Sequence, residues 1–218
     1  MAKTVYHQEL KSFFGNQDHL ALAQTQTSSQ MVFELLSERK PTKKELELFD
    51  LILNLSIDHG PDTPSAIETI KAAREGKTIS ESLAAGVLQI NDRHGGAIEP
   101  LMKIIYQIKD GKKTIAQVLE ENNRMPGFGH RIYKNQDPRA QLILNKSEQL
   151  LGENPYAKIV GEIEIELEKK TGKKLVINID GAIAAVLCGF GFDPKLGKAV
   201  FLVARTPGLI GQYLNNCA

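Results

Sequence analysis

The stretch MPGFGHRIYKNQDPR, which runs from Met125 to Arg139, contains two glycines directly before a histidine. Gly127 and Gly129 can adopt backbone conformations that other residues rarely adopt, and they let a ligand approach the main chain closely. His130 follows at once, so this loop would present its imidazole. The segment therefore predicts a functional loop.

A helix is expected to begin directly after this loop. Asp137 and Pro138 are typical of the N-cap and the first position of a helix. Arg139 would lie on its first turn, where a guanidinium can bind a carboxylate through two hydrogen bonds. Two further motifs flank the loop in the chain, DRHGG at 92–96 and NIDG at 178–181.

Length and composition point to an ordinary globular protein of one or two domains. The 218 residues include 27 Lys and Arg against 26 Asp and Glu, so the charge gives no reason to expect nucleic acid or a membrane as a partner. No stretch approaches the roughly 20 apolar residues of a membrane span, and MAKTVYHQEL lacks the apolar core of a signal peptide. Cys188 and Cys217 have no metal-ligand spacing. We expect a cytoplasmic protein.

Apolar residues recur with helical period in most of the chain, between capping and breaking residues. The pattern predicts an all-α fold, because alternating runs and hairpin signals are not recognisable. One short apolar run, 174–179, could be a strand. A short helix is expected at 3–14, Pro194 to Val203 is expected to be helical, and Pro207 is expected to open a separate last helix. The other expected helices cover approximately 28–40, 42–55, 64–75, 80–90, 97–109, 114–122, 139–151, 155–170 and 181–190.

Three of the five histidines are candidates for chemistry. His59, His94 and His130 each lie beside glycine in a loop that interrupts a helical pattern, whereas His7 and His19 have no such context. A zinc site needs three or four ligands with supporting groups. No two of these histidines share a helix face, so we do not expect a metal.

Asp180 is the candidate proton-transferring group. It lies between the apolar run 175–179 and an apolar helix start, and such surroundings raise the proton affinity of a carboxylate. The alternative is that Asp180 is only a helix N-cap. Arg139 and Arg205 are candidate anchors for substrate carboxylates, although a structural Asp or Glu could instead pair with Arg205. Gly127, Gly129 and Lys134 could hold phosphates or an adenine, a weak signal when taken alone.

Five segments in this order resemble the citrate synthase family. They are IDHGPDTPSA, SLAAGVLQINDRHGGAIEPLMK, PGFGHRIYKNQDPR, INIDGAIAAVL and ARTPGLIGQYL. From about Leu51 to Leu214 the chain is more similar to the citryl-CoA-cleaving domain of ATP-citrate lyase and to stand-alone citryl-CoA lyases.

The resemblance implies a citrate synthase-like helical fold with two domains and a cleft between them. The large domain would comprise 1–97 and 199–218, and the small domain 98–198. The resemblance also implies a homo-oligomer, a dimer or larger, because the family shares its sites between subunits. No permanently bound cofactor is expected, because the coenzyme A thioester is a substrate.

The resemblance further implies a role for each site residue. His94 would stabilise the enol of acetyl-CoA, His130 would polarise the carbonyl of oxaloacetate, and Asp180 would take the methyl proton. In the cleavage direction, His130 would help to remove the proton of the citryl hydroxyl. The carboxylates of the substrate would be held by His59, Arg139 and Arg205. The loop that lies against coenzyme A would comprise Pro126, Gly127, Phe128 and Gly129.

Departures from the synthase pattern favour the lyase branch. Most of the long amino-terminal region of synthases is missing, and Asp180 is followed by Gly-Ala-Ile in place of an aromatic and a small hydroxyl residue. A third departure, the end at Ala218, omits a segment that usually supplies another arginine to a neighbouring subunit's site, and it concerns the carboxylate-binding set and not the choice of branch. His94 favours the synthases, since the compared ATP-citrate lyases have an aromatic residue there.

The expected function is cleavage of citryl-CoA to acetyl-CoA and oxaloacetate. The alternatives are a compact citrate or methylcitrate synthase and a non-catalytic helical subunit.

Overall fold

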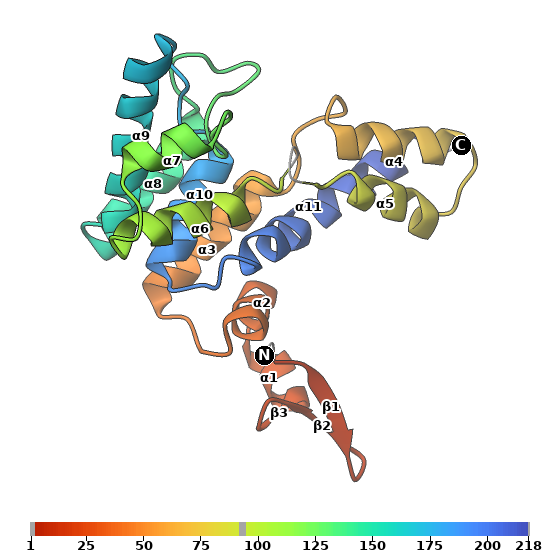
Figure 1. Cartoon of the computed structure of the whole chain (residues 1–218). Coiled ribbons are helices and arrows are strands. Elements are labelled where there is room, and N and C mark those ends of the chain that lie inside the picture. Colours follow the sequence, from red (N-terminus) through yellow and green to blue (C-terminus); the bar gives the residue numbers. More distant parts are fainter. Residues whose placement is uncertain (1–2, 92–94, 218) are drawn as a thin grey trace. The chain divides into compact units, whose positions relative to one another are not determined.

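The structure is a computed structural model that describes residues 3–91 and 95–217. It contains helices α1–α11 and three short strands within those ranges, which confirms a mostly helical fold (Figure 1). The chain divides into two compact units, one up to Asp50 and one from Leu51 onward. The predicted division into 1–97 with 199–218 and 98–198 stays a prediction.

The first unit begins with a sheet where a helix was expected. Strands β1 (Val5–Gln8), β2 (Lys11–Phe14) and β3 (Gln17–Asp18) form an antiparallel sheet in the order β1-β2-β3. The helix predicted at 3–14, and the expectation that the chain contains no hairpin, are therefore wrong. Tyr6 stacks on Phe13, its partner across the strands, with 5.3 Å between ring centroids.

The turn of this hairpin explains why the sequence did not reveal it. Glu9 and Leu10 both have positive φ, 47° and 64°. Two-residue hairpin turns normally carry glycine or asparagine at such positions, so the usual signal is absent.

Side chains that were not predicted as caps begin the first two helices, and α1 lies in a stretch that was not expected to be helical. Asp18 caps α1 (His19–Thr25), and Thr27 caps α2 (Ser28–Ser37). Thr42 and Glu45 exchange hydrogen bonds of 2.8 and 3.2 Å in a capping box at the start of α3 (Lys43–Ser56), which continues into the second unit.

The second unit contains the remaining helices and all the candidate site residues. Most bounds match the predicted segments to within a few residues, because Thr63, Thr78 and Thr114 cap their helices as side-chain acceptors. The helices are α4 (Pro64–Arg74), α5 (Ile79–Leu88), α6 (Ile98–Lys109), α7 (Ile115–Glu121), α8 (Pro138–Leu151), α9 (Pro155–Thr171), α10 (Ile179–Gly189) and α11 (Leu196–Leu214).

Helix α10 forms the centre of this unit. It packs against α6, α8 and α9, which surround it in Figure 1. Every side chain from Gly181 to Cys188 is buried, as expected for a helix that is apolar on all sides. Its surroundings fix the position of its first turn, which carries Asp180.

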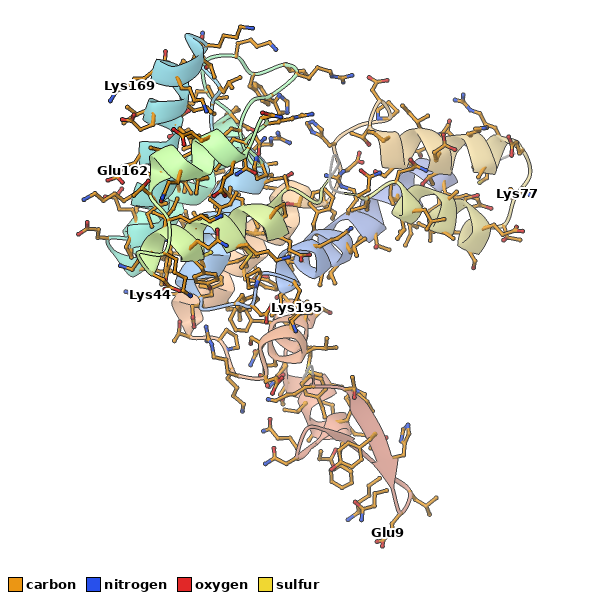
Figure 2. All side chains as sticks on the ribbon, in the orientation of Figure 1. Glu9, Lys44, Lys77, Glu162, Lys169 and Lys195 are labelled. Atoms are coloured by element: carbon orange, nitrogen blue, oxygen red, sulfur yellow. The ribbon has the colours of Figure 1, made fainter. Side chains whose placement is uncertain are left out.

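Helix α9 covers α10 with one face and meets solvent with the other. Ile159, Ile163 and Leu167 are buried at helical spacing. Glu162 and Lys169 are exposed and extend outward from α9 in Figure 2. The charged face of α9 is therefore a solvated surface.

Helix α11 corrects two expected boundaries. Two helices separated at Pro207 were predicted, but α11 is continuous and contains Pro207. Proline removes one helical hydrogen bond. Buried contacts on both sides of it, at Phe201 and Leu209, hold the helix together. Leu209 joins Ala66 and Ile70 of α4 in one apolar cluster.

The apolar run 174–179 does not form a regular strand. Its only pairing among the described residues is an isolated antiparallel bridge between Ile177 and Phe128. None of the described helices is both long and apolar enough to cross a lipid bilayer.

Replacing Gly208 should destabilise the second unit. A Cβ atom there would lie 2.0 Å from the carbonyl oxygen of Ile57, so Gly208→Ala should lower the free energy of unfolding by about 1–3 kcal/mol. Gly211 lies on the same helix, and a methyl group added there would meet nothing within 4 Å, so Gly211→Ala should gain up to about 1 kcal/mol. Urea unfolding of both variants measures the difference, and equal midpoints would contradict the packing described.

Candidate active site

The candidate site residues of the second unit surround one cavity of about 440 Å³. Its walls come from the loop before α4, the loop 122–137 that contains His130 (the histidine loop), the first turns of α8 and α10, and the middle of α11. The lining residues that the sequence predicted are His59, Gly129, His130, Arg139, Asp180 and Arg205.

The first turn of α8 holds Arg139 through its own cap. Asp137 is fully buried and accepts the backbone N–H of Arg139 at 3.0 Å. The same carboxylate accepts from Nε of Arg139 at 3.0 Å and from Nη2 at 2.8 Å. Such a two-bond pair fixes the plane of the guanidinium.

The guanidinium of Arg139 also faces both histidines of the cavity. Its Nη1 lies 3.0 Å from Nδ1 of His59, and its Nη2 lies 3.2 Å from Nε2 of His130. The two imidazoles have their centroids 5.8 Å apart. Loops separated by many residues in the chain therefore converge on one arginine.

Backbone contacts determine which nitrogen of His130 carries the proton. Nδ1 accepts the N–H groups of Ile132 and Tyr133, each at 3.1 Å. A nitrogen that accepts carries no proton, so the neutral ring is protonated on Nε2. Nε2 and Nη2 of Arg139 are then both donors. A ligand oxygen within reach of both nitrogens would accept a hydrogen bond from each.

The environment favours the neutral form of both histidines. Burial lowers the pKa of His130, and the charge of Arg139 lowers it further. The pKa of His59 is lowered for the same two reasons, with a further contribution from Arg205. Neutral imidazoles that donate N–H can polarise an oxygen without transferring a full charge.

Asn178, and not Asp180, caps α10. Its Oδ1 accepts the N–H groups of Asp180 at 3.0 Å and Gly181 at 3.2 Å. Its Nδ2 donates to the carbonyl of Gly129 at 3.0 Å. The interpretation of Asp180 as only a cap is therefore wrong, and its carboxylate is left available to the cavity.

Glycines bring the histidine loop into backbone contact with α10. Gly127 has φ of +80°, and its carbonyl accepts the N–H of Asn178 at 3.0 Å. A Cβ atom on Gly181 would lie 2.5 Å from that carbonyl oxygen. Both positions therefore require glycine, which explains the residue that follows Asp180.

Asp180 has a raised proton affinity. Burial raises its pKa to about 6, against the opposing charges of Arg205 and Arg139, while the charge of Asp137 raises it further. Asp180 is half-buried and lines both this cavity and a second one beside it. A carboxylate with this pKa is suited to proton transfer near neutral pH.

Arg205 lines the cavity and has a buried guanidinium nitrogen without a hydrogen-bond partner among the described residues. It is 4% exposed, its Nε donates to the carbonyl of Ser56 at 2.9 Å, and its guanidinium lies 4.8 Å from the ring centroid of Phe201. In the described part of the chain, its Nη1 has no hydrogen-bond partner, and no carboxylate of a described residue forms an ion pair with it. A buried donor without a partner is unfavourable, so a ligand carboxylate would relieve it.

A second cavity, of about 500 Å³, meets the first at Asp180. It is lined by Pro126, Gly127 and Phe128 of the histidine loop, the segment expected to contact coenzyme A. Asp180 and Asn178 line both cavities. The two predicted binding regions therefore adjoin at the predicted proton-transferring group.

Lys134 lies outside this arrangement, and the position of His94 is not described. His94, with Asp92 and Arg93, lies outside the described residues. Lys134 is exposed, lines neither cavity and donates to the carbonyl of His130 at 3.0 Å. The described ranges contain no group of three or more His, Cys, Asp or Glu that could hold a metal ion.

Several residues that line or support the site were not predicted in these roles. Arg124 is exposed and lines both cavities, but nothing in its sequence context distinguishes it from a surface arginine. Asn178 precedes a helix start, so its capping role could have been recognised. Asp137 was predicted as a cap, without its ion pair to Arg139.

A protein-family model places the whole chain in one family. The model for "Citrate synthase, C-terminal domain" matches residues 2–218. The chain is also 32% identical to Citrate synthase 2 of Bacillus subtilis over 192 residues, which cover 83% of this chain and 51% of that protein. Mouse ATP-citrate synthase is 28% identical over 201 residues, which are 82% of this chain and 18% of that protein. The chain thus spans a fifth to a half of these relatives.

Among solved structures, the citryl-CoA lyase from Hydrogenobacter thermophilus is similar to nearly the whole of this chain. The TM-score is 0.91 at 32% identity, and the match covers 99% of this chain and 86% of that one. The predicted citrate synthase-like helical fold is confirmed.

The raised pKa of Asp180 predicts that its charge destabilises the folded protein. The folded pKa of about 6 exceeds the ordinary value of 3.8, so above pH 6 folding must accommodate an unfavourable charge. Asp180→Asn should therefore be more stable than the wild type at pH 7.5, and this advantage should shrink as the pH falls from 6 to 4. Urea unfolding at pH 7.5 and 4.5 measures it. Asp62→Asn, an exposed aspartate of the same cavity, is the control, and a less stable Asp180→Asn at pH 7.5 would contradict the description.

Proposed function

The chain belongs to the citrate synthase family, and from this premise we propose that it is a citryl-CoA lyase, which cleaves citryl-CoA to acetyl-CoA and oxaloacetate. One observation carries the proposal. Asp180 lines both cavities, with the arginine anchors in one and the loop expected to contact coenzyme A in the other. A bond between an acetyl-CoA half and an oxaloacetate half would lie where these cavities meet.

Two further observations favour cleavage over synthesis. The similar citryl-CoA lyase superposes on 99% of this chain with a TM-score of 0.91. Gly181 stands where synthases usually carry an aromatic residue, and its close contact with Gly127 leaves no room for a side chain.

The anchors suit the oxaloacetate half of the substrate. Arg139 is fixed in plane by Asp137, and Arg205 has an unpaired Nη1 among the described residues. One carboxylate would bind each guanidinium, with His59 beside the first. Nε2–H of His130 would then donate to the oxygen that is a hydroxyl in citryl-CoA and a carbonyl in oxaloacetate, and stabilise its negative charge during bond cleavage.

The protonation of His130 changes one expected role. Nδ1 accepts two backbone N–H groups, so Nε2 carries the proton and cannot take another from the citryl hydroxyl. We assign that step to Asp180. The hydroxyl oxygen and the methylene carbon are both bonded to the same carbon atom, so one carboxylate can reach both.

In this scheme Asp180 both accepts and returns the proton, so it is regenerated in each turnover. Its carboxylate accepts the hydroxyl proton, the carbon–carbon bond breaks to give a ketone and an acetyl-CoA enolate, and Asp180 returns the proton to the enolate carbon. The resemblance assigns His94 to the enolate oxygen. Condensation follows the same steps in reverse, with ionised Asp180 as the starting form in both directions.

Coenzyme A thioesters are substrates in this proposal, and no permanently bound cofactor is invoked. Pro126, Gly127, Phe128 and Gly129 would contact the coenzyme, whereas Lys134 could reach it only by leaving the carbonyl of His130. A homo-oligomer that shares its sites, located in the cytoplasm, also belongs to the proposal.

Product analysis separates the lyase from its alternatives. The protein would be given citryl-CoA and, separately, acetyl-CoA with oxaloacetate, and the products followed by chromatography. A lyase forms acetyl-CoA and oxaloacetate from citryl-CoA without releasing citrate. A citrate synthase, the alternative favoured by the Bacillus subtilis relative, releases free coenzyme A and citrate from the condensation mixture. A non-catalytic subunit does neither.

Asp180→Asn should abolish proton exchange at the acetyl group. The variant keeps the shape of the side chain but not the titrating carboxylate, so turnover should fall by on the order of 10²-fold or more. Deuterium exchange from solvent into the methyl group of acetyl-CoA, with an unreactive oxaloacetate analogue present, isolates this step. The binding of coenzyme A is the control and should be unchanged. Equal exchange in both proteins would assign the base to another residue.

The pH dependence should be the same in both directions. Cleavage to acetyl-CoA and oxaloacetate neither consumes nor releases a proton, so the equilibrium between the two sides is independent of pH. Because ionised Asp180 is the reactive form, kcat/KM for citryl-CoA and for the condensing pair should fall together as pH decreases through about 6. Profiles with acid limbs more than one pH unit apart would exclude this scheme.

A further inference from the structure

Asp137 uses both carboxylate oxygens in the interior of the site. Oδ1 accepts the backbone N–H and Nε of Arg139, each at 3.0 Å. Oδ2 accepts Nη2 of Arg139 at 2.8 Å and the backbone N–H of Ile179 at 3.2 Å. The side chain is fully buried, and it lines neither of the two site cavities.

These bonds join two helix starts that carry different parts of the site. Arg139 lies on the first turn of α8, and Ile179 is the first residue of α10, directly before Asp180. One carboxylate therefore connects the candidate carboxylate anchor to the residue beside the candidate base. Helices α8 and α10 also pack against each other.

We propose that Asp137 is the positioning residue of this site, because it fixes the guanidinium of Arg139 relative to the carboxylate of Asp180. The proposal rests on the function proposed above. Asp137 contacts no substrate in this scheme. It sets the separation between the group that holds the oxaloacetate half and the group that moves the proton.

The chemistry of the contacts requires a carboxylate. All four groups that face Asp137 are N–H donors. An asparagine offers only one acceptor oxygen, and its NH₂ group would face donors. Asp137→Asn has nearly the same shape, but it loses the ion pair and at least one further hydrogen bond.

The charge of Asp137 also balances the field at Asp180. Asp180 faces Arg139 from α8 and Arg205 from α11, both of which favour its charged form, while Asp137 opposes them. Arg124 and His130 line the same cavity. Without the negative charge of Asp137, the positive charge of Arg139 would act on Asp180 unopposed. The charged form of Asp180 would be favoured, so its pKa should fall.

Asp137→Asn tests the proposal by three measurements on the full chain. Calorimetry should show that oxaloacetate binds on the order of 10–100-fold more weakly, because its anchor is no longer held in place. The affinity for coenzyme A should change less than about twofold. Carbon-13 NMR of the carboxyl groups should show Asp180 titrating at lower pH than in the wild type, with Asp180→Asn used to assign the signal.

Two variants serve as controls. Asp18→Asn alters another helix cap, which accepts the N–H of Ala21 at 3.0 Å in the first unit, and it should leave all three measurements unchanged. Asp137→Glu keeps the charge but lengthens the side chain. It should weaken oxaloacetate binding while Asp180 titrates close to its wild-type pH, and it provides the test if Asp137→Asn does not fold, as judged by circular dichroism.

The outcomes separate this proposal from the proposed function. Unchanged oxaloacetate affinity in a folded Asp137→Asn or Asp137→Glu would overturn the positioning role. Equal losses of oxaloacetate and coenzyme A affinity would also overturn it, because they would indicate a general structural defect. A wild type that binds neither ligand would refute the proposed function, and an unchanged Asp180 titration in Asp137→Asn would then refute the positioning role independently.

Discussion

The contact between the histidine loop and the start of α10 is the constraint on which the site depends. It is made by backbone and by two glycines, with the carbonyl of Gly127 against Gly181 and the N–H of Gly129 bonded to the carbonyl of Val176 at 2.7 Å. Because glycine has no side chain, the two segments meet main chain to main chain at this point. The imidazole of His130 and the carboxylate of Asp180 therefore line one cavity. The buried helix α10 carries Asp180 and holds the loop that carries His130.

Much of this arrangement could be predicted because it is encoded locally. The cap at Asp137, the proline after it and the glycines around Phe128 specify a loop followed by a helix, whatever the rest of the chain does. Short-range signals of this kind also located α2 to α10 closely. The grouping of His130 with Asp180 came from the family resemblance, since nothing in the spacing of the two motifs requires them to meet.

What could not be predicted depends on tertiary contacts. The hairpin at 5–14 turns through Glu9 and Leu10 at positive φ, which local propensity disfavours. Pro207 lies inside a helix because buried neighbours outweigh its missing donor. The proton position on His130 depends on backbone groups of Ile132 and Tyr133, and their orientation is visible only in the folded loop.

The fixed proton on His130 also limits which small molecules the cavity can accept. Nε2–H of His130 and the guanidinium of Arg139 are both donors that face the same point, and a donor array favours an oxygen with lone pairs there. A 2-amino acid of the same size and shape, such as aspartate, would bring an ammonium group to that point, and neither His130 nor Arg139 could accept a hydrogen bond from it. The site would thus discriminate keto acids from the corresponding amino acids through hydrogen-bond polarity, without any difference in size.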